Sequence, residues 1–193
     1  MKEKDFIEFA KIVGKLKKIP RTGWKERKVK SPESIADHSF RTALLGMVLS
    51  DSEKLDTEKI IRMLLLHDIE ESIIGDIAAI YKVKMNKMDL KKKQMRAMKK
   101  VLSPLPKDLR NKYFLLWKEI EEEKTIEAKF CKDVDKLEMM IQAFEYELED
   151  KKNIKKLRKF WEWEMNKPNR YPLTKRIYKK LENEKNENHK KRR

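Results

Sequence analysis

Cysteine, glycine and proline are scarce in this chain of 193 residues, which has one cysteine, four glycines and six prolines. The single cysteine, Cys131, excludes an internal disulfide and is typical of a protein in a reducing compartment. So few turn-forming residues argue against an all-β protein, in which tight turns are frequent. We therefore expect a helical protein without disulfides.

Long apolar runs are also missing. The longest uncharged stretch near the expected core covers residues 42–50, far short of the roughly 20 residues that a membrane-spanning helix needs. The N-terminus, MKEKDFIEFAKIVGKLKK, is charged throughout and lacks the apolar core of a signal peptide. These features predict a cytoplasmic protein that does not enter the membrane.

Charge of one sign is in excess, with 49 lysines and arginines against 33 acidic residues and a formal net charge of +16. Such a balance favours anionic partners, for example nucleotides, nucleic acid or an acidic surface. A solvated surface rich in lysine and glutamate, of the kind common in thermophile proteins, gives the same composition. Composition leaves both interpretations open.

Apolar residues recur at helical spacing along most of the chain, as Phe6, Phe9 and Val13 do near its start. Ser31 with Pro32, and Asp56 with Thr57, have the residue types of helix N-termini. We expect one all-α domain of six to eight helices over 1–181 and a charged, disordered tail over 182–193. The expected helices cover 3–17, 31–49, 56–75, 81–102, 107–123, 125–149, 153–166 and a last segment from 173.

The stretch LLLHDIEE places His67 and Asp68 at the end of the most apolar helical segment. Buried polar groups cost free energy unless they are paired, hydrogen-bonded or bound to a metal. His38 also falls on an inward helix face, whereas the third histidine, His189, lies in the expected tail. A single buried histidine is more often structural than a ligand, but two, one beside an aspartate, favour a site.

Asp135 supplies a further inward carboxylate, because it shares a helix face with Ala128, Cys131, Met139 and Gln142. Asp133 and Glu138 lie at neighbouring angles and are expected to point outward. Cys131 itself is interpreted as a small buried hydrophobe rather than a ligand.

Two imidazoles and two carboxylates from three helices suit one divalent ion such as Mn, Fe, Co, Ni or Zn. The four expected ligands are His38, His67, Asp68 and Asp135. Glu71 follows Asp68 by three residues and shares its face, which places it to work beside the metal.

Four segments in order carry a family resemblance: PRTGW, ESIADHSFRTALL, HDIEESIIGDI and VDKLEMMIQAFEYE. Together they resemble the HD-domain phosphohydrolase superfamily, and within it the 5′-deoxynucleotidase (YfbR-like) branch. The resemblance spans about residues 15–147 and implies a single HD-domain helical bundle. An HD doublet alone would be weak support, but four motifs in order are specific.

The resemblance implies a metal held by His38, His67, Asp68 and Asp135. It implies catalytic roles for Glu71 and Asp76 and places Trp24 beside the sugar, where it disfavours a 2′-hydroxyl. The bacterial enzymes have an arginine directly before that tryptophan, whereas this chain has Gly23, so Arg21 or Lys17 is expected to contact the phosphate instead.

The activity that follows is hydrolysis of (deoxy)nucleoside 5′-monophosphates by attack of a metal-bound water, in a protein that forms a homodimer. Two other functions stay open: an enzyme of this class that acts on another small phosphate ester or a nucleotide polyphosphate, and a basic nucleic-acid-binding protein with a structural metal site.

The residues also have simpler explanations. Glu71 could be an exposed helix charge like Glu70, Asp76 could cap the segment after it, and Trp24 could be ordinary packing. Trp117, Trp161 and Trp163 are expected in the core or in an interface.

Overall fold

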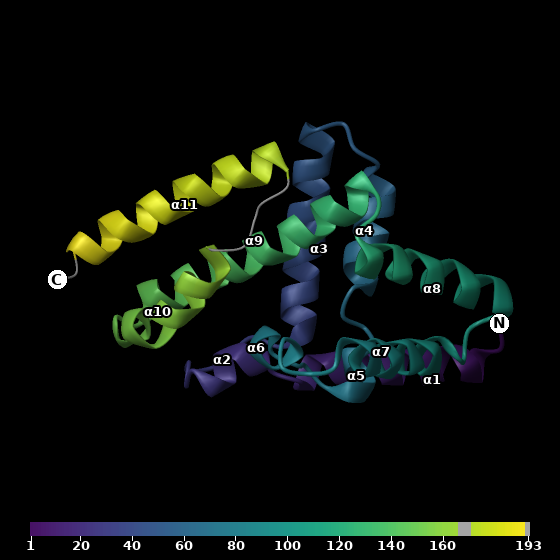
Figure 1. The fold of residues 1–193 in the computed structure, drawn as a ribbon. Coiled ribbons are helices and arrows are strands. Elements are labelled where there is room, and N and C mark those ends of the chain that lie inside the picture. The colour runs from purple at the N-terminus through teal and green to yellow at the C-terminus, as the bar shows by residue number, and fades with distance from the viewer. Residues whose placement is uncertain (166–170, 192–193) are drawn as a thin grey trace.

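The structure, a computed structural model, describes residues 1–165 and 171–191 and is all-α, as predicted (Figure 1). Within the described residues, eight helices have ten or more residues, and three have five or fewer. The long helices are α1 (Glu3–Gly14), α3 (Ile35–Ser52), α4 (Thr57–Leu66), α7 (Lys87–Leu102), α8 (Lys107–Glu122), α9 (Ile126–Glu149), α10 (Lys152–Met165) and α11 (Pro172–Lys191). The short ones are α2 (Thr22–Glu26), α5 (Glu71–Ile74) and α6 (Ala79–Lys82), and a 3-10 turn, η1 (Lys15–Lys18), follows α1.

The centre of the fold is formed by α3 and α4, which lie side by side and are crossed by α9 (Figure 1). Gly46 permits close approach of α3 to α4, since a Cβ added there would lie 2.2 Å from Leu64 Cδ1. Apolar side chains of all three helices, among them Ile60, Met63 and Val134, fill the space between them. This packing places the middle of α9 against the N-terminal half of α3 and the end of α4.

The start of α3 differs from the prediction. Ser34, not Ser31, is the N-cap: its hydroxyl accepts the backbone N–H of Asp37, whose carboxylate accepts the N–H of Ser34. Ser31 instead has φ +52°, a turn conformation that ends the preceding irregular segment. Two Ser residues with an acid nearby look alike in sequence, and the complete reciprocal cap forms at Ser34.

The expected helix over 56–75 is interrupted. Asp56 caps α4 as predicted, but α4 ends at Leu66, residues 67–70 form a turn, and the four-residue α5 follows. His67 and Asp68 therefore lie at a helix end, not inside a helix. Gly75, at φ +76°, ends α5 in a backbone conformation that residues with a side chain rarely adopt.

Two further expectations need correction. The basic helix expected over 81–102 is divided into α6 and α7, because Asn86 accepts backbone N–H groups of Met88 and Asp89 and starts a new helix. The tail expected to be disordered continues α11 to Lys191; residues 192–193 lie outside the described residues. Tertiary contacts explain this helix, because Lys185 Nζ lies 4.2 Å from the Trp161 ring centroid and His189 contacts Glu147.

In the part of the chain that the structure describes, every helix is too short or too polar to cross a lipid bilayer.

Candidate metal centre and substrate cavity

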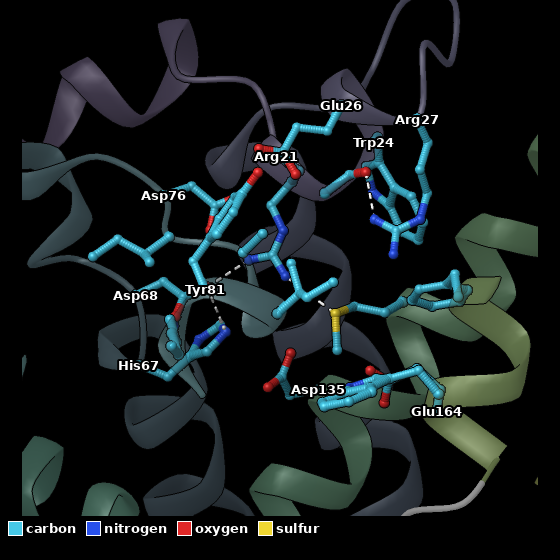
Figure 2. Close-up of a pocket in the computed structure, with 18 of the residues that line it drawn as sticks. Arg21, Trp24, Glu26, Arg27, His67, Asp68, Asp76, Tyr81, Asp135 and Glu164 are labelled. Carbon is cyan, nitrogen blue, oxygen red and sulfur yellow. Dashed lines mark hydrogen bonds and ion pairs between the residues drawn. The ribbon is translucent and has the colours of Figure 1, made fainter. Parts of the chain in front are cut away.

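Three of the four predicted ligands, His38, His67 and Asp135, come from α3, the turn after α4 and α9 and have donor atoms within 4.8 Å of one another. The fourth, Asp68, adjoins both histidines (Figure 2 shows His67, Asp68 and Asp135). His67 Nε2 lies 3.3 Å from His38 Nε2 and 3.2 Å from Asp68 Oδ2. His38 Nε2 lies 3.1 Å from Asp135 Oδ1 and 3.8 Å from Asp68 Oδ2. Adjacent residues within a regular helix point about 100° apart. The turn at 67–70 allows His67 and Asp68 to face the same side.

The separations among His38, His67 and Asp135, and that between His67 and Asp68, suit donors that share one metal ion, whereas His38 and Asp68 lie somewhat further apart at 3.8 Å. With metal–ligand bonds of about 2.1 Å, neighbouring donor atoms lie roughly 3.0–3.5 Å apart. Two neutral imidazole nitrogens and two carboxylate oxygens suit a borderline divalent ion. The HD-family expectation of a divalent cation therefore agrees with the donors present, and the geometry alone does not select the metal.

The other ring nitrogen of each histidine is held by an acceptor, which directs Nε2 toward the centre. His38 Nδ1 bonds Glu138 Oε2, and His67 Nδ1 bonds the carbonyl oxygen of Leu64. Glu138 is fully buried and accepts Arg41 Nε at 2.7 Å. With both Nδ1 atoms donating, two Nε2 lone pairs and two carboxylates face one another, an arrangement that a cation stabilises.

The pKa values of the same groups also favour a cation at this position. Burial and Arg21 lower the pKa of His38, but its hydrogen bonds to Asp135 and Glu138 outweigh them and raise its pKa to about 10. Burial raises the pKa of Asp135, yet its hydrogen bond to His38 and the charge on His67 hold that pKa well below the usual range. The cluster thus favours positive charge at its centre.

Glu138 contacts the predicted ligand His38, a position that the sequence analysis did not anticipate. We expect Glu138→Gln to weaken metal affinity by about 10- to 100-fold, because the amide holds His38 less firmly and adds no negative charge behind the ring. Titration of the metal-free protein with Zn²⁺ or Co²⁺ measures this. Glu145→Gln is the matched control, since Glu145 bonds Arg41 on the same helix face without touching His38. Equal losses in the two variants would contradict a role through His38.

Glu71 and Glu70 are both buried, each about 2% exposed, so the expectation of an exposed Glu70 is wrong. Burial, followed by the charge of Asp68, raises the pKa of Glu71 well above its usual range. The same two causes raise the pKa of Glu70 to about 8. Glu71 Oε1 lies 3.7 Å from Lys82 Nζ, and its Oε2 has no hydrogen-bond partner among the described residues.

Asp76 connects the site to α2. Its carboxylate accepts the backbone N–H of Thr22, and its carbonyl accepts the Thr22 hydroxyl at 2.9 Å. Asp76 therefore holds the start of α2. This contact places Arg21 and Trp24 next to the ligands.

A cavity of about 910 Å³ opens over the ligands (Figure 2). His67, Asp68, Asp135 and Asp76 line it, whereas His38 and Glu71 are buried behind its surface. The other side chains that line the cavity include Arg21, Trp24, Arg27, Tyr81, Lys82, Glu70, Lys132, Phe160 and Trp163. The volume is in the range of small-molecule sites in proteins.

Of the two expected phosphate contacts, one lines the cavity. Arg21 Nη1 donates to Asp68 Oδ2 at 2.9 Å, and burial lowers its pKa less than Asp68, Asp76, Glu71 and Asp135 raise it, so it stays charged. Lys17 is exposed on η1 and is not part of the cavity wall. At Gly23, Arg27 Nη1 donates to the glycine carbonyl at 2.8 Å, so a different arginine occupies the space beside this residue.

Cations from other elements also reach the cavity, and the sequence analysis did not single them out. Lys132 lies on α9 one turn before Asp135 and pairs with Glu121 at 2.7 Å. Lys82 ends α6 beside Glu71. The three-residue spacing of Lys132 and Asp135 was the available signal for the first; nothing local in the sequence indicated the second.

Several other expectations concern packing. Trp24 is buried and packs edge-on against Phe160 and Tyr146, yet it also lines the cavity. Trp117 and Trp161 are core residues, as predicted. Trp163 is 40% exposed and lines the cavity, so it is not in the core.

The two α9 acids expected to point outward are both buried. Glu138 contacts His38, and Asp133 accepts the backbone N–H of Tyr171 and the hydroxyl of Thr174. Cys131 is a buried free thiol, in agreement with its interpretation as a small hydrophobe.

Comparison with known proteins gives concordant matches. The family model of the HD domain matches residues 13–170. The 5′-deoxynucleotidase HDDC2 of Homo sapiens is 41% identical over 144 residues, which cover 75% of this chain and 69% of that protein. Its Mus musculus counterpart is 43% identical over 146 residues, covering 75% and 72%.

Solved structures agree. The PH0347 protein of Pyrococcus horikoshii superposes with a TM-score of 0.71 and 34% identity over 92% of this chain and 96% of that one. A predicted metal-dependent phosphohydrolase of Magnetospirillum magnetotacticum gives a TM-score of 0.61 and 29% identity, covering 74% and 72%. The family match, which covers residues 13–170, places this chain in the HD-domain family, and His38, His67, Asp68 and Asp135 lie close together in it.

Proposed function

We propose that this protein is a metal-dependent phosphohydrolase that removes the 5′-phosphate from nucleoside 5′-monophosphates and prefers the deoxy form. The observation that carries the proposal is the convergence of His38, His67, Asp68 and Asp135 at the base of a cavity large enough for a nucleotide. The names of the similar human and mouse proteins, 5′-deoxynucleotidases, support the substrate class.

Phosphate monoester hydrolysis is slow in water because an anionic ester repels its nucleophile. A bound divalent ion (Co, Mn, Fe, Ni or Zn) would be held by the four ligands and would polarise a phosphoryl oxygen and acidify water. The remaining roles fall to side chains of the chain itself.

Arg21 is the proposed phosphate contact, because it lines the cavity and adjoins Asp68, whereas Lys17 does not reach it. Lys132 and Lys82 bring positive charge from α9 and α6. Three fixed cations around the phosphoryl group stabilise the negative charge that grows on its oxygens during transfer.

Glu71 is the proposed proton donor. Burial and the charge of Asp68 raise the pKa of the Glu71 carboxyl group and so favour its protonated form. Because Glu71 lies behind the cavity surface, the proton that the 5′-oxygen of the leaving nucleoside needs would pass through a water molecule. Asp76 is proposed as a second acid near the substrate; its bond to Thr22 supports the placement of Arg21 and Trp24. Trp24 forms the cavity wall against which the sugar packs, where a 2′-hydroxyl would lose its hydrogen bonds to water.

A homodimer in the cytoplasm is also proposed. Phe40, Leu44 and Val48 form an outward apolar stripe on α3, exposed by 69%, 44% and 58%, which suits a contact with a second copy. The buried free thiol of Cys131 accords with a reducing compartment.

The experiment that tests the function compares dAMP, dTMP and AMP in protein reconstituted with Co²⁺, Mn²⁺ or Zn²⁺. We expect release of inorganic phosphate that depends on the metal, with a higher kcat/KM for dAMP than for AMP. Equal values for dAMP and AMP would reject the deoxy preference. Inactivity toward every monophosphate would reject the proposed function.

A further inference from the structure

Glu33 occupies a position that connects the cavity wall to the ligand cluster. It lies between the irregular stretch 27–32 and the start of α3. Its carboxylate Oε1 accepts the indole N–H of Trp24 at 2.8 Å. That N–H is the one polar group of the indole, so this bond fixes how the ring is turned within its pocket.

The backbone of Glu33 is held as firmly as its side chain. Its N–H donates to the Tyr146 hydroxyl at 2.8 Å, and its carbonyl accepts the N–H of Arg21 at 2.9 Å. The neighbouring pair Pro20 and Ser34 forms an antiparallel bridge. The segment that carries Glu33 is therefore paired directly with the segment that carries Arg21 and leads into α2.

The Glu33 carboxylate also lies close to His38, one of the predicted metal ligands. Single donor atoms of Glu33, His38 and Glu138 all lie within 4.8 Å of one another. One side chain thus contacts the indole that lines the cavity and lies next to the imidazole that points Nε2 at the ligand cluster. This carboxylate therefore links the position of the Trp24 indole to that of the His38 ring.

We propose that Glu33 is a positioning residue for sugar selection: it holds the Trp24 indole at the distance from the ligands at which a 2′-deoxyribose fits and a 2′-hydroxyl does not. The inference deepens the proposed function and depends on it for the identity of the sugar. The anchoring of the ring is a property of this chain's own residues and can be observed without turnover.

The first measurement is the ¹⁵N–¹H resonance of the Trp24 indole in the full chain, assigned by its loss in Trp24→Phe. Glu33→Ala is expected to shift this resonance and to remove its protection from hydrogen exchange. Glu33→Gln retains a carbonyl acceptor at the same position and is expected to keep the protection. An unchanged resonance in Glu33→Ala would overturn the anchoring role.

The second measurement is the ratio of kcat/KM for dAMP to that for AMP. We expect Glu33→Ala to lower this ratio by about fivefold to tenfold, the equivalent of one hydrogen bond, and Glu33→Gln to preserve it. In a Trp24→Phe background, which lacks the indole N–H, Glu33→Ala should change the ratio no further. A merely structural role would lower both rates together and leave the ratio unchanged.

The outcomes separate the two proposals. A wild-type enzyme that prefers dAMP, with a Glu33→Ala variant of the same preference, overturns the inference and leaves the proposed function standing. A wild-type protein without any nucleotidase activity rejects the proposed function, and the sugar-selecting role of Glu33 fails with it even where the indole resonance reports anchoring.

Discussion

His67→Ala is expected to remove both the bound metal and the turnover. His67 is buried, its Nε2 lies within 3.3 Å of His38 Nε2 and Asp68 Oδ2, and its Nδ1 is held by the Leu64 carbonyl. Loss of a residue that supports a metal ligand already costs about 10- to 100-fold, so loss of a ligand should exceed about 100-fold in affinity and activity. Metal content by mass spectrometry and phosphate release from dAMP measure the two effects.

His189→Ala is the matched control, because it removes a histidine of α11 that contacts Glu147 and is not among the four predicted ligands. It should leave metal content and turnover near the wild-type values. A His67→Ala protein that is folded, contains the metal and turns over dAMP at the wild-type rate would reject the metal centre itself.

Glu71→Gln is expected to lower kcat by about 10²- to 10⁴-fold, the usual contribution of a positioned general acid. The amide has nearly the same shape but no acidic proton to supply to the leaving oxygen. Since Glu71 is not among the four ligands, metal content should stay at the wild-type level. Single-turnover release of phosphate, measured at matched metal occupancy, isolates this step.

Glu70→Gln provides a close comparison, because Glu70 is adjacent, equally buried and also has a raised pKa. We expect it to retain most of the activity. The pH profile adds a second criterion: wild-type kcat should fall as pH rises through the raised pKa of Glu71, and the Glu71→Gln variant should lack that limb. If Glu70→Gln were the more damaging change, the two acids would have to exchange roles.

Periodicity predicted a large part of the fold because buried faces repeat every three to four residues. The same spacing that puts Asp135 on a face with Ala128 and Cys131 places it at the cavity, and the cap at Asp56 lies where the sequence indicated. Local chemistry was sufficient for these features, since the information lies within one or two turns.

The remaining features depend on partners distant in sequence. A glutamate on a helix is usually solvated, and Glu138 is buried only because His38 and Arg41, about 100 residues earlier, neutralise it. The apolar pattern continues through residues 67–70, so it does not mark the turn that lets His67 and Asp68 face one point. The helical end of α11 likewise depends on Glu147 and Trp161.

The absence of a side chain at Gly46 has a consequence for how the ligand cluster could change over evolution. The separation of α3 from α4 fixes the span between the two imidazoles, and that separation depends on a residue with no donor atom, two turns from His38. A methyl group there would push against Leu64, the residue whose carbonyl orients His67. A substitution at Gly46 is therefore expected to change metal affinity from the apolar interior, with all four predicted ligands unchanged.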